Sequence, residues 1–155
     1  MNSTIQRQLR NIQQSQEYHV TLKDGNYLKW VVEVLSLDPN SALSRSLCGQ
    51  NLTFEVTFLE TFPQSAPFVR IISHTVSGGS IYSNTFCVTE LSDQSWNQQT
   101  DVAELLQALI LFLYDNGATA TSATPTMSAA KEGYRYVLNA HQWKNSAFES
   151  TVGTT

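Results

Sequence analysis

Alternating apolar residues constrain the fold of this chain more than any other feature. Large apolar side chains occupy every second position over 18–22, 28–34 and 52–58, and a fourth apolar run covers 68–72. Alternation with a period of two predicts strands that bury one face. Asp24-Gly25, between the first two runs, suits a tight hairpin turn. The four runs therefore predict an antiparallel meander.

Helical periodicity appears in the sequence both before and after the predicted strands. Isoleucine and leucine spaced i, i+4, i+7 over 5–12 predict a short N-terminal helix. A wide apolar stripe over 102–113 predicts a longer helix, with Asp101 and Glu104 as its capping box. A last helix is expected over 128–143. The fold class is therefore α+β.

A stretch of about 27 residues between Ser73 and Asp101 shows no sustained period. A loop of that length in a small domain is usually functional. It contains Cys87, and cysteine is a strong nucleophile that can carry an acyl group as a thioester. A lone cysteine is more often a small buried apolar residue, so both interpretations of Cys87 are open at this point. The polar stretch 118–126 is predicted to be a flexible connection.

Length and composition favour one small globular domain. The chain has 155 residues, 41% of them hydrophobic and 14% charged, which indicates a single core rather than disorder. We place the core domain at 1–145 and a polar C-terminal tail at 146–155. Two cysteines form no disulfide framework, and the N-terminus lacks the apolar core of a secretory signal. A reducing compartment is expected, the cytoplasm, the nucleus or both.

Charge and residue spacing exclude several partners. The net charge is −4 and lysine and arginine form no cluster, so binding to nucleic acid or to acidic lipid is not expected. Membrane insertion is not expected either, because no apolar run approaches the roughly 18 residues that a spanning helix needs. The three histidines and two cysteines lack the spacing of metal ligands. No metal and no cofactor are predicted.

Two motifs resemble those of the ubiquitin-conjugating enzymes. Phe62-Pro63 followed by 66–70 is similar to the proline turn and fourth strand of that family. Residues 86–91, FCVTEL, followed by Trp96 are similar to its active-site segment.

The resemblance is closest to the Q-type branch of the family. It includes WVVEVLSLDPNSALSRSL at 30–47, FVRIIS at 68–73 and VSGG at 76–79, and it covers nearly all of 8–143. It implies the ubiquitin-conjugating fold, with an N-terminal helix, a four-stranded meander, an active-site loop and two C-terminal helices.

The resemblance also implies a chemistry. Cys87 would accept ubiquitin, or a ubiquitin-like protein, from an activating enzyme as a thioester. It would then pass this group to an acceptor amine, or a hydroxyl, of a protein substrate, with or without a ligase. Cys87 is thus the candidate catalytic nucleophile.

The groups that assist Cys87 are harder to assign. Most of the family carries a His-Pro-Asn motif about ten positions before the cysteine; this chain has none, and the Q-type branch has a glycine-bearing loop instead. Asn84 is a candidate oxyanion donor, although asparagine in a loop often serves turn geometry. His74 is a candidate base, or a histidine bonded locally at a strand end.

A candidate ligase face is formed by Phe62, Pro63 and Trp96, together with the first helix. Ligase-binding members usually carry an exposed apolar residue directly after the Phe-Pro pair, and Gln64 occupies that position here. Phe62 and Trp96 could equally be core residues.

Two other functions compete with conjugation. On the same fold, the chain could be a catalytically inactive module that binds ubiquitin or acts as a scaffold, with Cys87 retained for packing. A cysteine hydrolase could pair Cys87 with His74 or His141, although no orienting Asp or Asn is identifiable. Fast alkylation at neutral pH would indicate an exposed thiol of low pKa and would argue against a packed one.

Overall fold

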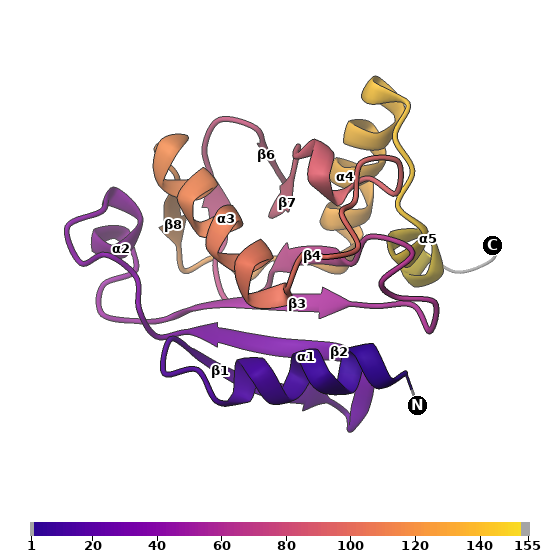
Figure 1. Ribbon diagram of the computed structural model, residues 1–155. Helices are drawn as coiled ribbons and strands as arrows, with labels where there is room; N and C mark the ends of the chain where they lie inside the picture. The colour runs from indigo at the N-terminus through magenta and orange to yellow at the C-terminus, as the bar shows by residue number, and fades with distance from the viewer. Residues whose placement is uncertain (1, 153–155) are drawn as a thin grey trace.

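A four-stranded antiparallel sheet lies at the centre of the computed structural model, which describes residues 2–152 (Figure 1). Its strands follow one another in the order of the chain, as the alternation predicts. Trp30 is paired with Leu22 on one side and with Val56 on the other, so these apolar residues share one face. The strands are β1 (Tyr18–Lys23), β2 (Asn26–Val34), β3 (Leu52–Thr57) and β4 (Phe68–Ile71).

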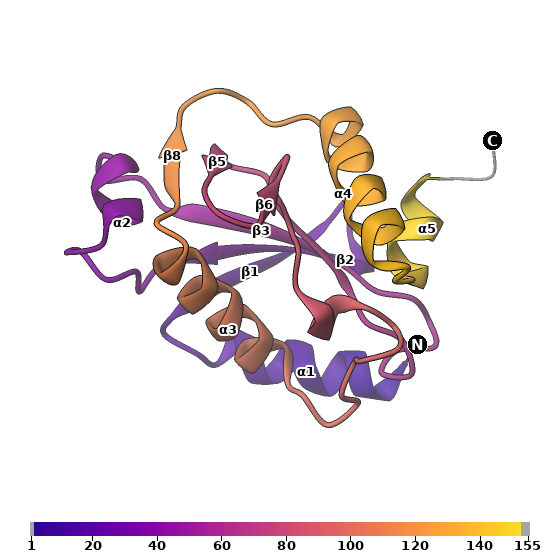
Figure 2. The same ribbon diagram turned by 90° about the horizontal axis from the view of Figure 1, so that it is seen from above.

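Helices cover the sheet on one face and at both ends. The central helix α3 crosses above the sheet, α1 runs beside β1, and α2 and α4 lie at opposite ends of the molecule (Figure 2). None of the helices in the described residues is long and apolar enough to cross a membrane. The helices are α1 (Ser3–Gln13), α2 (Ala42–Ser46), α3 (Val102–Asp115), α4 (Met127–His141) and α5 (Ser146–Val152).

The N-terminus of α3 is bonded to α1 rather than capped by its own sequence. Asp101 makes no side-chain capping bond, so the predicted capping box with Glu104 is wrong. Instead the buried Gln8 side chain accepts a hydrogen bond from the Val102 N–H (3.0 Å) and donates one to the Asp101 carboxylate (2.8 Å). A glutamine 94 residues away in the sequence thus supplies the cap.

The stretch expected to be irregular contains several short elements, and the stretch expected to be flexible contains one short strand. β5 pairs with β8, and β6 pairs with β7, each in antiparallel orientation. Strands of two or three residues are too short to show alternation, which is why the sequence did not predict them. They are β5 (Thr75–Ser77), β6 (Ile81–Tyr82), β7 (Thr85–Phe86) and β8 (Thr119–Thr121), with the 3₁₀ helix η1 at Thr89–Leu91.

The C-terminal stretch is part of the folded domain as far as residue 152. The predicted polar tail at 146–155 is corrected over 146–152, which form α5; residues 153–155 lie outside the described residues. Phe148 is fully buried, with its ring centroid 5.0 Å from those of both Phe68 and Tyr134. One large apolar residue in a seven-residue helix gives too weak a pattern to be recognised in the sequence.

A buried carboxylate lies on the face of the sheet opposite to Phe54 and its neighbours. The Glu55 side chain is 5% exposed and bonds to Lys23 (2.9 Å) and Arg70 (3.1 Å). Burial acts to raise the pKa of the Glu55 carboxyl, but the bonds and charges of Lys23 and Arg70 outweigh it, so the pKa lies below its ordinary value.

Substitution of the α5 aromatic residue should destabilise the whole domain. Phe148→Ala removes a fully buried ring and should lower the free energy of unfolding by about 3–5 kcal/mol, measured by chemical denaturation. Ser150→Ala, at an exposed position of the same helix, is the control and should change stability little. Equal effects of the two substitutions would contradict the placement of Phe148.

Acidification should remove the stability that Glu55 contributes. A carboxyl whose pKa is lowered on folding stabilises the protein above its unfolded-state pKa, and this contribution is lost as the pH falls through the folded-state value. The free energy of unfolding should therefore fall less steeply below pH 4.5 in Glu55→Gln than in the parent. Denaturant titrations between neutral and acidic pH test this, and parallel curves would contradict it.

Candidate active site

A small hairpin places Cys87 at the surface. Strands β6 and β7 are joined by Ser83 and Asn84, both with positive φ (50° and 67°), as a tight two-residue hairpin turn requires. Cys87 follows β7 directly, and its N–H donates to the Ser80 carbonyl (3.1 Å). η1 begins two residues later. The cysteine is therefore held between the hairpin and a helical turn.

The structure brings His141 to Cys87. His141 Nε2 lies 3.2 Å from Cys87 Sγ, although 54 residues separate the two in the sequence. His141 occupies the last position of α4 and is exposed, while Cys87 is partly buried against the apolar cluster of that helix. Of the two histidines considered as partners, His141 is the one in contact.

A tryptophan supports the histidine ring. The rings of His141 and Trp143 are stacked, with centroids 4.3 Å apart and planes inclined by 18°. Gln142, between them, has a positive φ of 56°, which turns the chain back so that the Trp143 N–H donates to the Leu138 carbonyl (2.9 Å). Among residues 2–152, no side chain bonds to His141 Nδ1, so stacking rather than a carboxylate orients this ring.

The pair combines a nucleophile with a base. Burial raises the pKa of the Cys87 thiol, so at neutral pH the group is mainly protonated. A neutral imidazole with a free Nε2 lone pair can accept the thiol proton at this distance. The arrangement is suited to acyl transfer through sulfur.

The loop before the hairpin packs against the end of α3. A Cβ atom on Gly79 would lie 2.9 Å from Asn116 Oδ1, and one on Gly78 would lie 3.0 Å from the Ala118 Cα. The Gly79 N–H also donates to the Asn116 carbonyl (3.3 Å). A side chain at Gly78 would press on the backbone of Ala118, whereas one at Gly79 would displace the Asn116 side chain, so the close approach favours glycine most strongly at position 78.

The structure places Asn84 inside the loop, where its side chain bonds to the backbone. It is 2% exposed; its amide donates to the carbonyls of Ile71 (2.8 Å) and His74 (2.6 Å), and its Oδ1 accepts from the Val76 N–H (2.9 Å). Both amide hydrogens are thus in use. The oxyanion-donor role of Asn84 stays a prediction, and it would require the amide to leave those carbonyls.

His74 is buried and bonded through both ring nitrogens. Nδ1 pairs with Ser73 Oγ (2.9 Å) and Nε2 with Gln50 Oε1 (2.8 Å), and the residue is 6% exposed. Neither ring nitrogen contacts Cys87. A catalytic role for His74 stays a prediction, and the two hydrogen bonds of its ring go to Ser73 and Gln50 rather than to the thiol.

The three residues of the candidate ligase face are close together, but two of them are buried. The rings of Phe62 and Trp96 lie 6.1 Å apart and are 2% and 9% exposed. Trp96 Nε1 donates to the Pro63 carbonyl (2.9 Å), which fixes the turn. Pro63 is half-buried and Gln64 exposed. A ligase contact here remains a prediction, and it would involve Pro63 and Gln64 more than the two rings.

The second cysteine and the acidic residues offer no further centre. Cys48 is exposed in the turn after α2, and in the part of the chain that the structure describes its thiol hydrogen-bonds to the carbonyls of Arg45 and Ser46 only. Within residues 2–152, no group of three or more His, Cys, Asp and Glu side chains is arranged to hold a metal ion.

Several curated proteins that are similar in sequence, and several solved structures that are similar in fold, are named as ubiquitin-conjugating enzymes. No protein-family model matches the chain. The human and mouse proteins named ubiquitin-conjugating enzyme E2 Q1 are each 24% identical to it over 155 residues, covering 89% of this chain and 37% of theirs. Ubiquitin-conjugating enzyme E2 25 of Caenorhabditis elegans is 20% identical over 156 residues, covering 88% and 40%.

Solved structures agree on the fold. A ubiquitin-conjugating enzyme E2 from Plasmodium falciparum superimposes with a TM-score of 0.60 and 21% identity, covering 73% of this chain and 83% of that one. Human ubiquitin-conjugating enzyme E2 G1 gives a TM-score of 0.60 with 19% identity, covering 74% and 94%.

The protein therefore has the ubiquitin-conjugating fold, as the sequence motifs predict. Within that fold its sequence resembles the Q-type ubiquitin-conjugating enzymes, since its curated relatives include the Q1 enzymes and proteins named as Q-like. The chain spans well under half the length of the Q1 enzymes it matches.

The reactivity of the Cys87 thiol should increase well into the alkaline range. Because burial raises its pKa above the ordinary 9.0, the alkylation rate in a Cys48→Ala background should still be rising at pH 9. The rate constant for iodoacetamide, measured from about pH 6 to 10 beside N-acetylcysteine, tests this. A plateau in the neutral range would contradict the raised pKa.

Proposed function

We propose that this protein is a ubiquitin-conjugating enzyme. Cys87 accepts ubiquitin, or a ubiquitin-like protein, from an activating enzyme as a thioester and transfers it to an amine or hydroxyl of a protein substrate. A ligase directs the transfer or is dispensable, and the protein acts in the cytoplasm, the nucleus or both. The observation that carries this proposal is the 3.2 Å contact between Cys87 Sγ and His141 Nε2, within the segment that resembles the family's active site.

Charging, which is the formation of the thioester between Cys87 and the modifier, begins with removal of the proton from the Cys87 thiol. Because burial keeps Cys87 largely protonated at neutral pH, the thiol needs a base, and His141 is the base in contact with it. The thiolate then attacks the carboxyl carbon of the activated modifier. A carbon–sulfur bond forms, and the group that carried the modifier leaves as its own thiol.

Transfer reverses the role of the sulfur. The acceptor amine or hydroxyl attacks the thioester carbon, the Cys87 thiolate leaves, and His141 accepts the proton that the acceptor loses. The exposed imidazole can take part without rearrangement of α4, because its Nε2 already contacts the Cys87 sulfur while its ring stacks on Trp143. The oxyanion donor is still unassigned, since the Asn84 amide is occupied.

An inactive binding module on the same fold is the second candidate. It is favoured by the raised thiol pKa and by the engagement of both Asn84 amide hydrogens with backbone carbonyls. On this hypothesis Cys87 serves the packing of α4, and the protein holds ubiquitin without a covalent bond.

Charging distinguishes the two hypotheses. The protein is incubated with ubiquitin, an activating enzyme and ATP and analysed on gels with and without reducing agent. The expected result is an adduct that reducing agent removes, absent in Cys87→Ala and unchanged in Cys48→Ala. If no adduct forms with several activating enzymes and modifiers, the binding module is the better account.

Loss of the base should slow the reaction without abolishing the fold. His141→Gln should lower the rate of discharge to free lysine or serine by about 10²-fold, a usual contribution of general base catalysis. His19→Gln, at an exposed position of β1, is the matched control and should leave the rate unchanged. If the two variants discharge at equal rates, His141 is not the base.

A further inference from the structure

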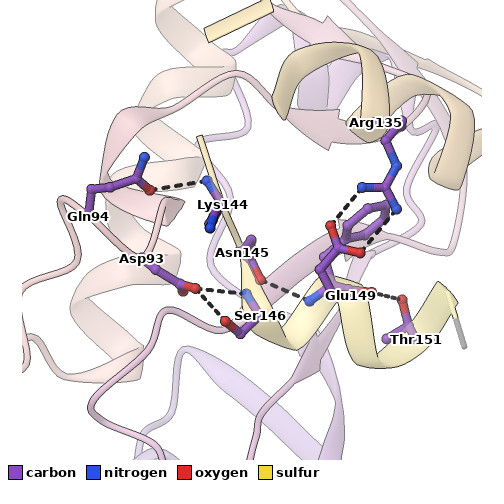
Figure 3. A network of polar contacts seen from close by, with 9 residues as sticks. Asp93, Gln94, Arg135, Lys144, Asn145, Ser146, Glu149 and Thr151 are labelled. Carbon is purple, nitrogen blue, oxygen red and sulfur yellow. Dashed lines mark hydrogen bonds and ion pairs between the residues drawn. The ribbon is translucent and has the colours of Figure 1, made fainter. Parts of the chain in front are cut away.

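Two short segments on either side of the Cys87–His141 pair are bonded to each other. One segment, 92–95, follows η1 after Cys87, and the other, 142–146, follows α4 after His141 (Figure 3). The Asp93 N–H donates to the Lys144 carbonyl (2.7 Å), and the Asp93 carboxylate accepts from the N–H (2.9 Å) and hydroxyl (2.6 Å) of Ser146. The nucleophile and its base are therefore tied together through the segments that follow them.

Gln94 bonds to Gln142, the residue that follows His141 in the sequence. Its Oε1 accepts from the Lys144 N–H (3.1 Å), and its Nε2 donates to the Gln142 carbonyl (3.1 Å). The two bonded residues flank Trp143, the residue whose ring stacks on His141. One side-chain amide thus holds the backbone on both sides of the stacked tryptophan, and Figure 3 shows the Gln94 side chain directed at Lys144.

The backbone of Gln142 has an unfavourable conformation that a hydrogen bond from another segment can stabilise. Gln142 has a positive φ of 56°, a conformation that residues other than glycine adopt rarely. The Gln94 amide bonds to its carbonyl and so favours the conformation that returns Trp143 to the histidine ring. Without this bond, the short connection between α4 and Asn145 would have more conformations available.

We propose that Gln94 is a positioning residue for His141. It fixes the Gln142–Lys144 backbone, this fixes the Trp143 ring, and the ring keeps His141 Nε2 on the Cys87 thiol. The proposal deepens the proposed function, because the base it positions is the one that would activate Cys87. It concerns the reactivity of the thiol, however, and can be tested without ubiquitin.

Gln94 is a better test of this idea than its buried neighbours. Asn145 is fully buried and donates to the carbonyls of Pro67 and Leu91, so its substitution would disturb folding. Asp93 also accepts from the Ala66 N–H and supports a second loop. Gln94 is exposed, and within residues 2–152 its side-chain bonds go to residues 142 and 144 alone.

The test measures alkylation of Cys87 by iodoacetamide near neutral pH in a Cys48→Ala background. Gln94→Ala removes both of these exposed hydrogen bonds and should lower the rate constant about fivefold, within the range expected for a net hydrogen-bond contribution. Gln98→Ala, at an exposed glutamine further along the same loop, is the control and should leave the rate unchanged. Thermal unfolding of both variants should match that of the parent.

A double-mutant cycle separates positioning from general loosening. In His141→Gln the rate is already reduced, and adding Gln94→Ala should then cause no further loss. The proposal is overturned if Gln94→Ala behaves like Gln98→Ala, if His141→Gln reacts at the parent rate, or if Gln94→Ala slows the reaction equally in both backgrounds. If the cycle shows the expected coupling but Cys87 cannot be charged with ubiquitin, Gln94 still positions His141 and the conjugation function is the part that fails.

Discussion

Burial of one face of the four-stranded sheet beneath α3 is the interaction on which the rest of the molecule depends. Trp30, Phe54 and Leu106 have no exposed surface, and side chains from α1 complete the same core. Burial of apolar surface on this scale is the main favourable contribution to folding. The elements that surround Cys87 are short and rely on this core for their position, since a two-residue strand has no stability of its own.

A second, smaller core holds the other half of the site. Phe68, Tyr134 and Phe148 pack together where α4 and α5 meet β4, and Cys87 lies against this cluster. The sheet core carries the hairpin that presents the thiol, whereas the smaller core carries the helix that ends at the imidazole. The distance between sulfur and nitrogen therefore depends on how the two cores pack against each other.

The sequence was informative where a pattern extends over many residues. Alternation predicted three strands of the sheet and an apolar run predicted the fourth, the helical stripe over 102–113 predicted α3, and the motif around Cys87 indicated the family resemblance. It was uninformative where a single long-range bond decides the structure. The Gln8 side chain caps a helix 94 residues away, and Phe148 is the one large buried side chain of a short helix; apolar periodicity reveals neither contact. His141 entered only as one of two possible partners, because spacing along the chain does not reveal which histidine reaches a cysteine 54 residues away.

The separation of Cys87 from His141 in the chain also determines when the site can exist. A ribosome releases the chain from its N-terminus, so the sheet and the hairpin emerge before α4 and the residues that hold its end. Until that helix has left the exit tunnel and packed, the nascent protein carries a cysteine without a base. The site is therefore completed by one of the last elements of the described chain to be synthesised.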